Sequence, residues 1–229
     1  MNRPVREGIK NRFVQVDTGT VVLEGDLSIP EGAQGIVVFV HGSGSSRHSP
    51  RNQYVANMLQ AGGLATLLFD LLTEQEERID LVTRQMRFDI DLLARRTIGA
   101  AEWLVEQPDA RDLKIGFFGS STGAAAALIA AAERPQLAGA VVSRGGRPDL
   151  AGQALSVVKA PVLLIVGELD TVVIDLNQKA LQQMRNAIVK RLEIVPGASH
   201  LFEEPGTLEI AALLARGWFQ RYLTLPRKD

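Results

Sequence analysis

The chain of 229 residues contains no cysteine, and this absence removes several kinds of chemistry at once. Without thiols there is no disulfide framework, no thiolate-bound zinc and no cysteine nucleophile. An excess of one charge is missing as well, because 25 Lys and Arg residues stand against 26 Asp and Glu residues. A formal net charge of −1 offers no overall attraction to nucleic acid or anionic lipid, so neither is an expected partner.

Long hydrophobic runs are also lacking. The longest, at 36–40, 64–69 and 161–166, fall far short of the roughly 20 residues that a membrane helix requires, so no membrane partner is expected. Residues 1–8 include several charges and lack the apolar stretch of a secretory signal, which predicts a cytoplasmic protein. With 46% hydrophobic and 22% charged residues, the composition is that of a globular chain with a sizeable core.

What the chain does contain is a regular alternation of short apolar runs and helical stretches. The runs are continuously apolar, which is typical of parallel strands covered on both faces. Residues 14–16 and 21–29 precede them and predict an antiparallel hairpin. We therefore expect an α/β fold with a mostly parallel sheet, helices on both faces and an N-terminal antiparallel hairpin. Further strands are expected at 36–40, 65–69, 114–118, 138–142, 161–166 and 191–195, and helices near 52–62, 87–107, 122–133, 176–187 and 207–222.

No internal repeat, low-complexity tract or linker divides the sequence, so we expect a single domain over residues 1–229. Segment 73–87 carries a dense cluster of charges. It is predicted to be a solvated loop or a frayed helix, and the alternative is a lid over the functional site. Nothing in the sequence decides between a monomer and a homodimer.

The first chemical motif lies at 119–123, which reads G-S-S-T-G between a predicted strand and an alanine-rich helix. This is the G-x-S-x-G pattern in a strand-turn-helix setting. A serine on such a tight turn projects its hydroxyl above the sheet, and the flanking glycines avoid clashes where strand and helix approach. Ser121 is therefore the candidate nucleophile.

A serine hydroxyl needs a histidine base, and that base needs a carboxylate to orient it. His200 lies in the loop after the last predicted strand, and Asp170 lies in the loop after the strand before it. In an open parallel sheet these loops converge at one edge, and the order Ser121, Asp170, His200 is typical of this kind of site. Glu168 and Asp70 are rival carboxylates, as is Asp175.

Cleavage of a carbonyl compound also requires amide donors for the developing oxyanion. The N–H of Thr122 follows the candidate nucleophile directly and begins a helix, so it is the first candidate. The second is the N–H of Ser43, in a glycine-rich loop after strand 36–40 whose Gly42 allows a close backbone approach. We expect His41, at the start of this loop, to hold the loop by hydrogen bonds.

Several basic residues are candidates for substrate binding because they lie in loops at the same predicted edge of the sheet. Together they would favour an anionic substrate or product. The alternative is that the arginines pair with nearby carboxylates or loop carbonyls. The basic candidates are Arg47, His48, Arg144 and Arg147, with Arg51 close to the first two, and Gly42 in the same loop is a further candidate.

The turn at Ser121, the glycine-rich loop at 41–46, Asp170 and His200 resemble the α/β-hydrolase superfamily, and the compact chain is similar to its dienelactone hydrolase family. The resemblance extends over nearly the whole chain from about residue 14 and implies the α/β-hydrolase fold without a large cap domain. It also implies cleavage of an ester or lactone through an acyl-enzyme. The sequence departs from the family in two ways: Ser121 replaces its cysteine nucleophile, and Gly42 and Ser43 stand where it carries a glutamate.

From residues and resemblance together we expect a serine hydrolase that cleaves carboxylic esters or lactones of small to medium substrates. It needs no cofactor and no metal in this scheme. Peptidase, thioesterase and acyltransferase activities on the same three residues are alternatives within the fold. A binding module that keeps the fold but has lost catalysis is the alternative of another class.

Overall fold

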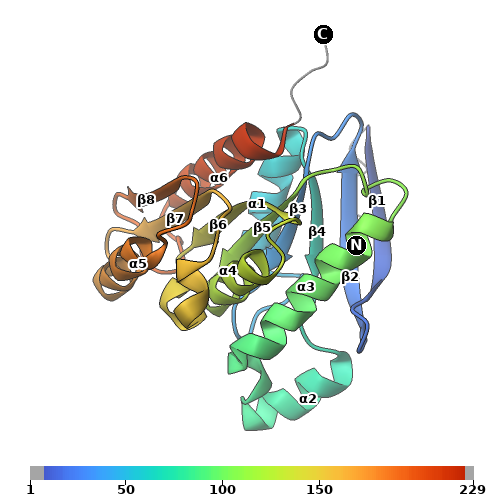
Figure 1. The fold of residues 1–229 in the computed structure, drawn as a ribbon, viewed down its shortest axis with the longest axis horizontal. Coiled ribbons are helices and arrows are strands. Elements are labelled where there is room, and N and C mark those ends of the chain that lie inside the picture. The colour runs from blue at the N-terminus through green and yellow to red at the C-terminus, as the bar shows by residue number, and fades with distance from the viewer. Residues whose placement is uncertain (1–7, 225–229) are drawn as a thin grey trace.

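The structure is a computed structural model that describes residues 8–224. Within this range one eight-stranded sheet has the order β1-β2-β4-β3-β5-β6-β7-β8 (Figure 1). β1 pairs antiparallel with β2 and β2 antiparallel with β4, whereas all other neighbours are parallel. This confirms the expected α/β-hydrolase fold with its antiparallel hairpin. The strands are β1 (Ile9–Asp17), β2 (Val22–Pro30), β3 (Ile36–Val40), β4 (Ala65–Phe69), β5 (Ile115–Ser120), β6 (Ala138–Arg144), β7 (Val162–Gly167) and β8 (Lys190–Val195).

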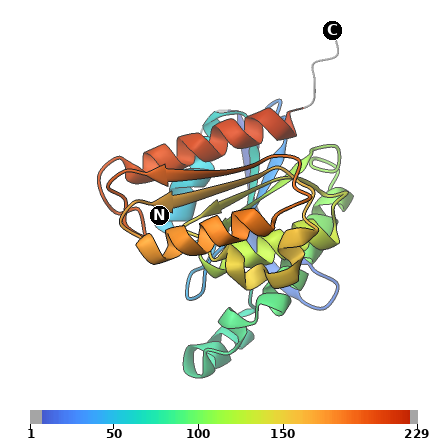
Figure 2. The same cartoon turned by 60° about the vertical axis from the view of Figure 1, so that its left-hand side comes forward.

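Helices cover both faces of the sheet, as Figures 1 and 2 show from two sides. α1 (Pro50–Ala61) and α6 (Thr207–Leu223) pack together on one face. α3 (Ile90–Glu106), α4 (Thr122–Glu133) and α5 (Thr171–Gln183) lie on the other, with the 3-10 segment Pro148–Ser156 between α4 and α5. No helix within 8–224 is long and apolar enough to cross a membrane.

Because helices cover both faces of the sheet, the central strands are buried at every position. Every residue of β3, β4, β5 and β7 is buried. Alternate side chains of these strands enter two separate hydrophobic clusters, one beneath α3, α4 and α5 and the other beneath α1 and α6. A strand with two buried faces has no solvent side on which polar residues would be favoured. Since β3, β5, β6, β7 and β8 are parallel, their carboxyl ends lie at one common edge of the sheet.

Two helices differ from the sequence-based expectation. α5 begins at Thr171, five residues before the expected start. Its first turn contains Thr171, Val172 and Val173, whose β-branched side chains have low helix propensity, and of these only Val173 is buried. Segment 73–87, expected as a solvated loop or a frayed helix, contains a capped helix, α2 (Glu74–Thr83), which projects from the body of the molecule (Figure 2), and a 3-10 turn at Met86–Phe88. Thr73 and Glu76 form a capping box that stabilises the first turn of α2.

Candidate active site

Ser121 lies on a strained turn between β5 and α4. Its backbone has φ 50° and ψ −123°, a conformation that non-glycine residues rarely adopt. A Cβ added at Gly119 would lie 2.4 Å from Cα of Ala124, and one added at Gly123 would lie 2.2 Å from the carbonyl oxygen of Val40. Both glycines are therefore required by close backbone packing around the turn, which is the reason the pattern needs them.

Asp170 and His200 meet although 30 residues separate them. Nδ1 of His200 lies 2.6 Å from Oδ2 of Asp170. The loops after β7 and β8 are pressed together, since a Cβ at Gly167 would lie 2.3 Å from the carbonyl oxygen of Ala198, and Leu169 N–H donates to the same oxygen. The Asp170 side chain is 15% exposed and that of His200 is 40% exposed. The carboxylate is thus sheltered while the imidazole reaches solvent.

The rival carboxylates have other partners. Glu168 accepts a hydrogen bond from the Gly197 N–H at 2.8 Å. Asp175 pairs with Lys179 one turn along α5, and Asp70 pairs with Arg47. Asp170 is consequently the carboxylate that the fold brings to His200.

Ser121 and His200 line the same cleft, which has a volume of about 200 Å³. The loop after β3 forms one wall, where a Cβ on Gly42 would lie 3.0 Å from Cβ of Ser121. Leu201 provides an apolar patch beside His200. The remaining lining residues are Ser43, Ser45, Ser49, Arg51, Asn52, Ser120, Arg144 and Gly145.

The two candidate oxyanion donors are neighbours, and Ser43 lines the cleft. The N–H of Ser43 donates to Oγ1 of Thr122 at 2.9 Å, which holds the loop after β3 against the start of α4. The amide of Thr122 was predicted from the sequence, but this role of its hydroxyl was not. A hydroxyl one residue after the candidate nucleophile is the sequence signal that could have suggested it.

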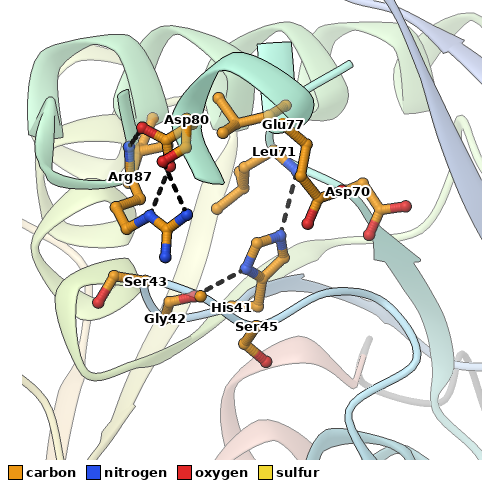
Figure 3. Close-up of a pocket in the computed structure, with 12 residues that line it drawn as sticks. His41, Gly42, Ser43, Ser45, Asp70, Leu71, Glu77, Asp80 and Arg87 are labelled. Atoms are coloured by element: carbon orange, nitrogen blue, oxygen red, sulfur yellow. Dashed lines mark hydrogen bonds and ion pairs between the residues drawn. The ribbon is translucent and has the colours of Figure 1, made fainter. Parts of the chain in front are cut away.

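His41 holds the loop after β3 in place, as expected. Leu71 N–H donates to Nε2 of His41 at 3.2 Å, so Nδ1 carries the proton and donates to the Gly42 carbonyl at 2.9 Å (Figure 3). Burial lowers the pKa of His41 and outweighs the opposing effects of the Gly42 carbonyl, Asp70 and Glu77. The imidazole is therefore neutral with both nitrogens occupied, which excludes it as the base.

Figure 3 shows the residues that line a second, smaller cavity between His41 and α2. Its volume is about 30 Å³. Asp80 and Arg87 form an ion pair on its wall. Burial raises the pKa of Asp80, but hydrogen bonds from Arg87 and Met86 outweigh this effect and lower it. The cavity has room for little more than one water molecule, so it is too small to hold a substrate.

Three of the basic candidates do not line the cleft. Arg47 is surrounded by Asp70, Glu24 and Asp26, and only 13% of its side chain is exposed. Arg147 pairs with Asp149 at 2.7 Å, and the exposed His48 makes only a backbone hydrogen bond to Ser46. Arg47 and Arg147 therefore pair with carboxylates, which is the alternative that the sequence left open for the arginines. Gly42, Arg51 and Arg144 do line the cleft.

Within residues 8–224 no group of three or more His, Asp or Glu side chains is arranged to hold a metal ion. None of the lining residues of the cleft is acidic. The polar groups at the site are hydroxyls, amides, one imidazole and two guanidinium groups, which are suited to acyl or anion chemistry.

Comparison with known proteins places this geometry in a family. Residues 23–221 match the dienelactone hydrolase family. A crystal structure of a dienelactone hydrolase from Anabaena variabilis is 60% identical, covers 95% of this chain and 100% of its own, and superposes with a TM-score of 0.92. Est1E from Butyrivibrio proteoclasticus shares the fold, with a TM-score of 0.75, 14% identity and coverage of 92% and 98%.

A Mycobacterium tuberculosis protein named as a candidate phosphoribosyl transferase is 56% identical over 221 residues. These residues are 95% of this chain and 48% of that protein, so the chain spans about half the length of this relative. By the match over most of its length, the chain belongs to the dienelactone hydrolase family.

Proposed function

We propose that this hydrolase cleaves carboxylic esters or lactones of small to medium substrates through an acyl-enzyme on Ser121. The observation that supports it most is the 2.6 Å contact of His200 with Asp170 in a cleft shared with the strained Ser121. A histidine oriented through Nδ1 leaves Nε2 to serve as general base. The cleft volume of about 200 Å³ favours a small acyl group.

In the proposed reaction, Nε2 of His200 removes the hydroxyl proton of Ser121 as Oγ attacks the carbonyl carbon. Asp170 stabilises the imidazolium, and the tetrahedral oxyanion accepts hydrogen bonds from the amides of Thr122 and Ser43. For this, the Ser43 amide turns from the Thr122 hydroxyl to the oxyanion. His200 then gives this proton to the leaving alcohol, which leaves the acyl group on Ser121. In the second half of the reaction, His200 removes a proton from water as the water attacks the acyl carbon, and it returns the proton to Oγ of Ser121 as the acid is released.

The relatives support an ester or lactone substrate to different degrees. Membership of the dienelactone hydrolase family favours carbonyl-ester chemistry, and the Anabaena structure extends this over the full length of the fold. The transferase name belongs to a protein about twice as long, so it carries no argument for phosphoribosyl transfer by this chain. The alternatives are peptidase, thioesterase and acyltransferase activities and a purely ligand-binding function. The substrate panel and the probe described next distinguish them from ester or lactone cleavage.

The test is to replace Ser121 by Ala and to assay a panel of p-nitrophenyl esters, lactones and thioesters. We expect kcat to fall by at least about 10³-fold on every ester or lactone that the wild type cleaves, because the covalent step is lost. A fluorophosphonate probe should label the wild type and leave Ser121→Ala unlabelled. The exposed Ser156→Ala is the matched control and should behave as wild type.

Undiminished activity in Ser121→Ala would refute the proposal. Folded wild-type protein that neither reacts with the probe nor cleaves any substrate would favour the ligand-binding alternative. Circular dichroism of each variant establishes that the fold is intact.

A further inference from the structure

β8 (Lys190–Val195) forms one edge of the sheet (Figure 1). It pairs in parallel with β7, and no other strand of residues 8–224 lies on its outer side. An edge strand presents unpaired backbone groups to which a further strand can bind, and proteins often block it with proline, a bulge or lysine. β8 contains no proline, its register with β7 is continuous, and Nζ of Lys190 is engaged by the Met184 carbonyl at 3.0 Å. The edge is therefore open to a further strand.

The pairing with β7 determines which backbone groups of β8 point outward. The carbonyls of Val189 and Val195 accept hydrogen bonds from amides of the β7 side at 2.8 and 3.0 Å. Every second residue of a parallel strand faces the same neighbour, so the odd-numbered residues between these two also face β7. The N–H and C=O groups of the even-numbered residues therefore point outward, and these residues are Lys190, Leu192 and Ile194.

The sequence of β8, K-R-L-E-I-V, is complementary to itself in one antiparallel register. When two copies pair about a two-fold axis at Leu192, the outward groups of Leu192 meet each other, and those of Lys190 meet Ile194 of the second copy. Arg191 of each copy then lies directly opposite Glu193 of the other. Opposite charges in such positions stabilise a sheet, and like charges destabilise it. A shift of the axis by one residue would set Arg191 against Arg191 or Glu193 against Glu193, so the charges select the register at Leu192.

A groove beside β8 adds apolar surface to this edge. Arg191 and Glu193 pair with each other on one face of the strand and line the groove, which separates them from α6 and has a volume of about 400 Å³. Ile210 and Leu213 of α6 line it as well and are 43% and 39% exposed. One helical turn further, a Cβ on Gly217 would meet no atom within 4 Å. A strand added beside β8 lies along this groove and removes part of its apolar wall from water.

We propose that β8 is the interface of a homodimer, in which two copies pair antiparallel about a two-fold axis at Leu192 and join their sheets into one. The partner is a second copy, because the charge pattern of β8 matches its own sequence read in the opposite direction. Two-fold symmetry repeats each contact, so the pair of Arg191 with Glu193 occurs twice across the interface. The two β8 strands run in opposite directions, so the clefts at their carboxyl ends lie on opposite sides of the dimer. The proposal does not depend on hydrolysis by Ser121.

The first test measures molecular mass by sedimentation equilibrium over a series of protein concentrations. We expect the wild type to form a dimer. Arg191→Glu places a glutamate opposite Glu193 of the second copy, and Glu193→Arg places an arginine opposite Arg191. Each change turns two attractive pairs into repulsive ones, so each should raise the Kd of the dimer by at least about 10-fold.

An equimolar mixture of Arg191→Glu and Glu193→Arg proteins should associate again. In the mixed dimer both cross-strand pairs join a glutamate to an arginine, although neither copy keeps the opposite charges within its own strand. Recovery in the mixture therefore reports the pairing between copies and not the pair within β8. Arg134→Glu is the matched control: it makes the same change of charge in an exposed pair with Glu102 and should leave the Kd unchanged.

Three results would overturn the proposal. The first is a wild type that remains monomeric at about 1 mM protein. The second is a dimer whose Kd is unchanged in both charge reversals, because its interface must then lie elsewhere. The third is a mixture of the two reversed proteins that associates no better than either protein alone. Circular dichroism establishes that each variant is folded.

A second measurement uses the absence of cysteine from the chain. Residues 191 and 193 of the two copies would form a non-hydrogen-bonded pair with Cα atoms about 4.5 Å apart, within the range of a disulfide. A mixture of Arg191→Cys and Glu193→Cys proteins should therefore form a linked dimer on mild oxidation. Each variant alone should link far less, because its two cysteines lie diagonally, about 7–8 Å apart. Equal linking in the mixture and in the separate variants would contradict the register and overturn the proposal.

Discussion

At the scale of single residues, the site depends on strain that its neighbours hold in place. Ser121 has a left-handed φ of 50°, which costs on the order of 1–3 kcal/mol in a residue with a side chain. The turn persists because Gly119 and Gly123 let β5 and α4 approach with no room for a Cβ. The strain keeps the hydroxyl at the mouth of the cleft, so local sequence and backbone packing together create the candidate nucleophile.

His41 makes a residue-scale prediction about pH. Its pKa in the folded protein lies below the ordinary value of 6.5, chiefly through burial. Below pH 6.5 the unfolded chain therefore binds a proton that the native state does not, and stability falls as the pH falls. We expect His41→Gln to flatten the slope of the unfolding free energy below this pH, by up to about 1.4 kcal/mol per pH unit.

Urea titrations at a series of pH values measure this slope. The exposed His48→Gln serves as the control and should keep the slope of the wild type. A slope that is the same in His41→Gln and wild type would show that His41 is not held neutral in the native state.

At the scale of elements, α2 is joined to the rest of the molecule by a small number of polar contacts. The carboxylate of Asp80 accepts hydrogen bonds from the backbone amides of Met86 and Arg87 and pairs with the Arg87 side chain. Glu76 of the same helix pairs with Arg96 of α3 at 2.8 Å. α2 contributes no residue to the two buried hydrophobic clusters, so these polar contacts hold the helix in position.

We therefore predict that Asp80→Ala loosens α2 before any other element. It removes the acceptor for two amides and leaves Arg87 without its carboxylate, so the unfolding free energy should fall by about 2 kcal/mol. Hydrogen exchange should rise selectively over residues 74–88. Glu74→Gln, which disturbs only the exposed pair with Arg78, should stay within about 0.5 kcal/mol of wild type. Uniform exchange across the chain in Asp80→Ala would contradict the prediction.

At the scale of the whole molecule, one sheet joins the two hydrophobic layers. Phe219 of α6 packs beneath one face, where a Cβ on Gly116 of β5 would lie 2.6 Å from its ring. Trp103 of α3 packs on the opposite face. Because the central strands contribute side chains to both layers, loss of one layer exposes the strands that the other requires.

This arrangement predicts a single cooperative unfolding transition. In a Trp218→Phe background, the fluorescence of Trp103 reports the α3 layer alone, since the chain has two tryptophans. Phe219→Ala in the α6 layer should lower the stability that Trp103 reports by about 3 kcal/mol, through the cavity it leaves. The 85%-exposed Val82→Ala should change it by less than about 0.5 kcal/mol. A Trp103 transition unmoved by Phe219→Ala would mean that the layers unfold separately.

The local signals in the sequence were enough to predict much of this molecule. Continuously apolar runs predicted the parallel strands, because both of their faces are buried, and G-S-S-T-G predicted the turn at Ser121, because only glycine fits beside it. The capping box of α2 was equally readable, yet the density of charge led to the expectation of a solvated loop or a frayed helix. The first turn of α5 was missed, since its β-branched residues have low helix propensity and give no local signal of a helix start.

Tertiary structure alone decided which charges have partners. Arg47, Arg144 and Arg147 are equivalent in sequence, each in or beside a loop at the same edge of the sheet. Two of them meet carboxylates, while Arg144 meets two aromatic rings and the amide of Asn52, 92 residues away. Pairing of charges depends on distances across the fold, which neither periodicity nor local spacing encodes. The sequence by itself thus determined the strands and the turn at Ser121, and the folded arrangement decided which arginine at this edge of the sheet stays without a carboxylate.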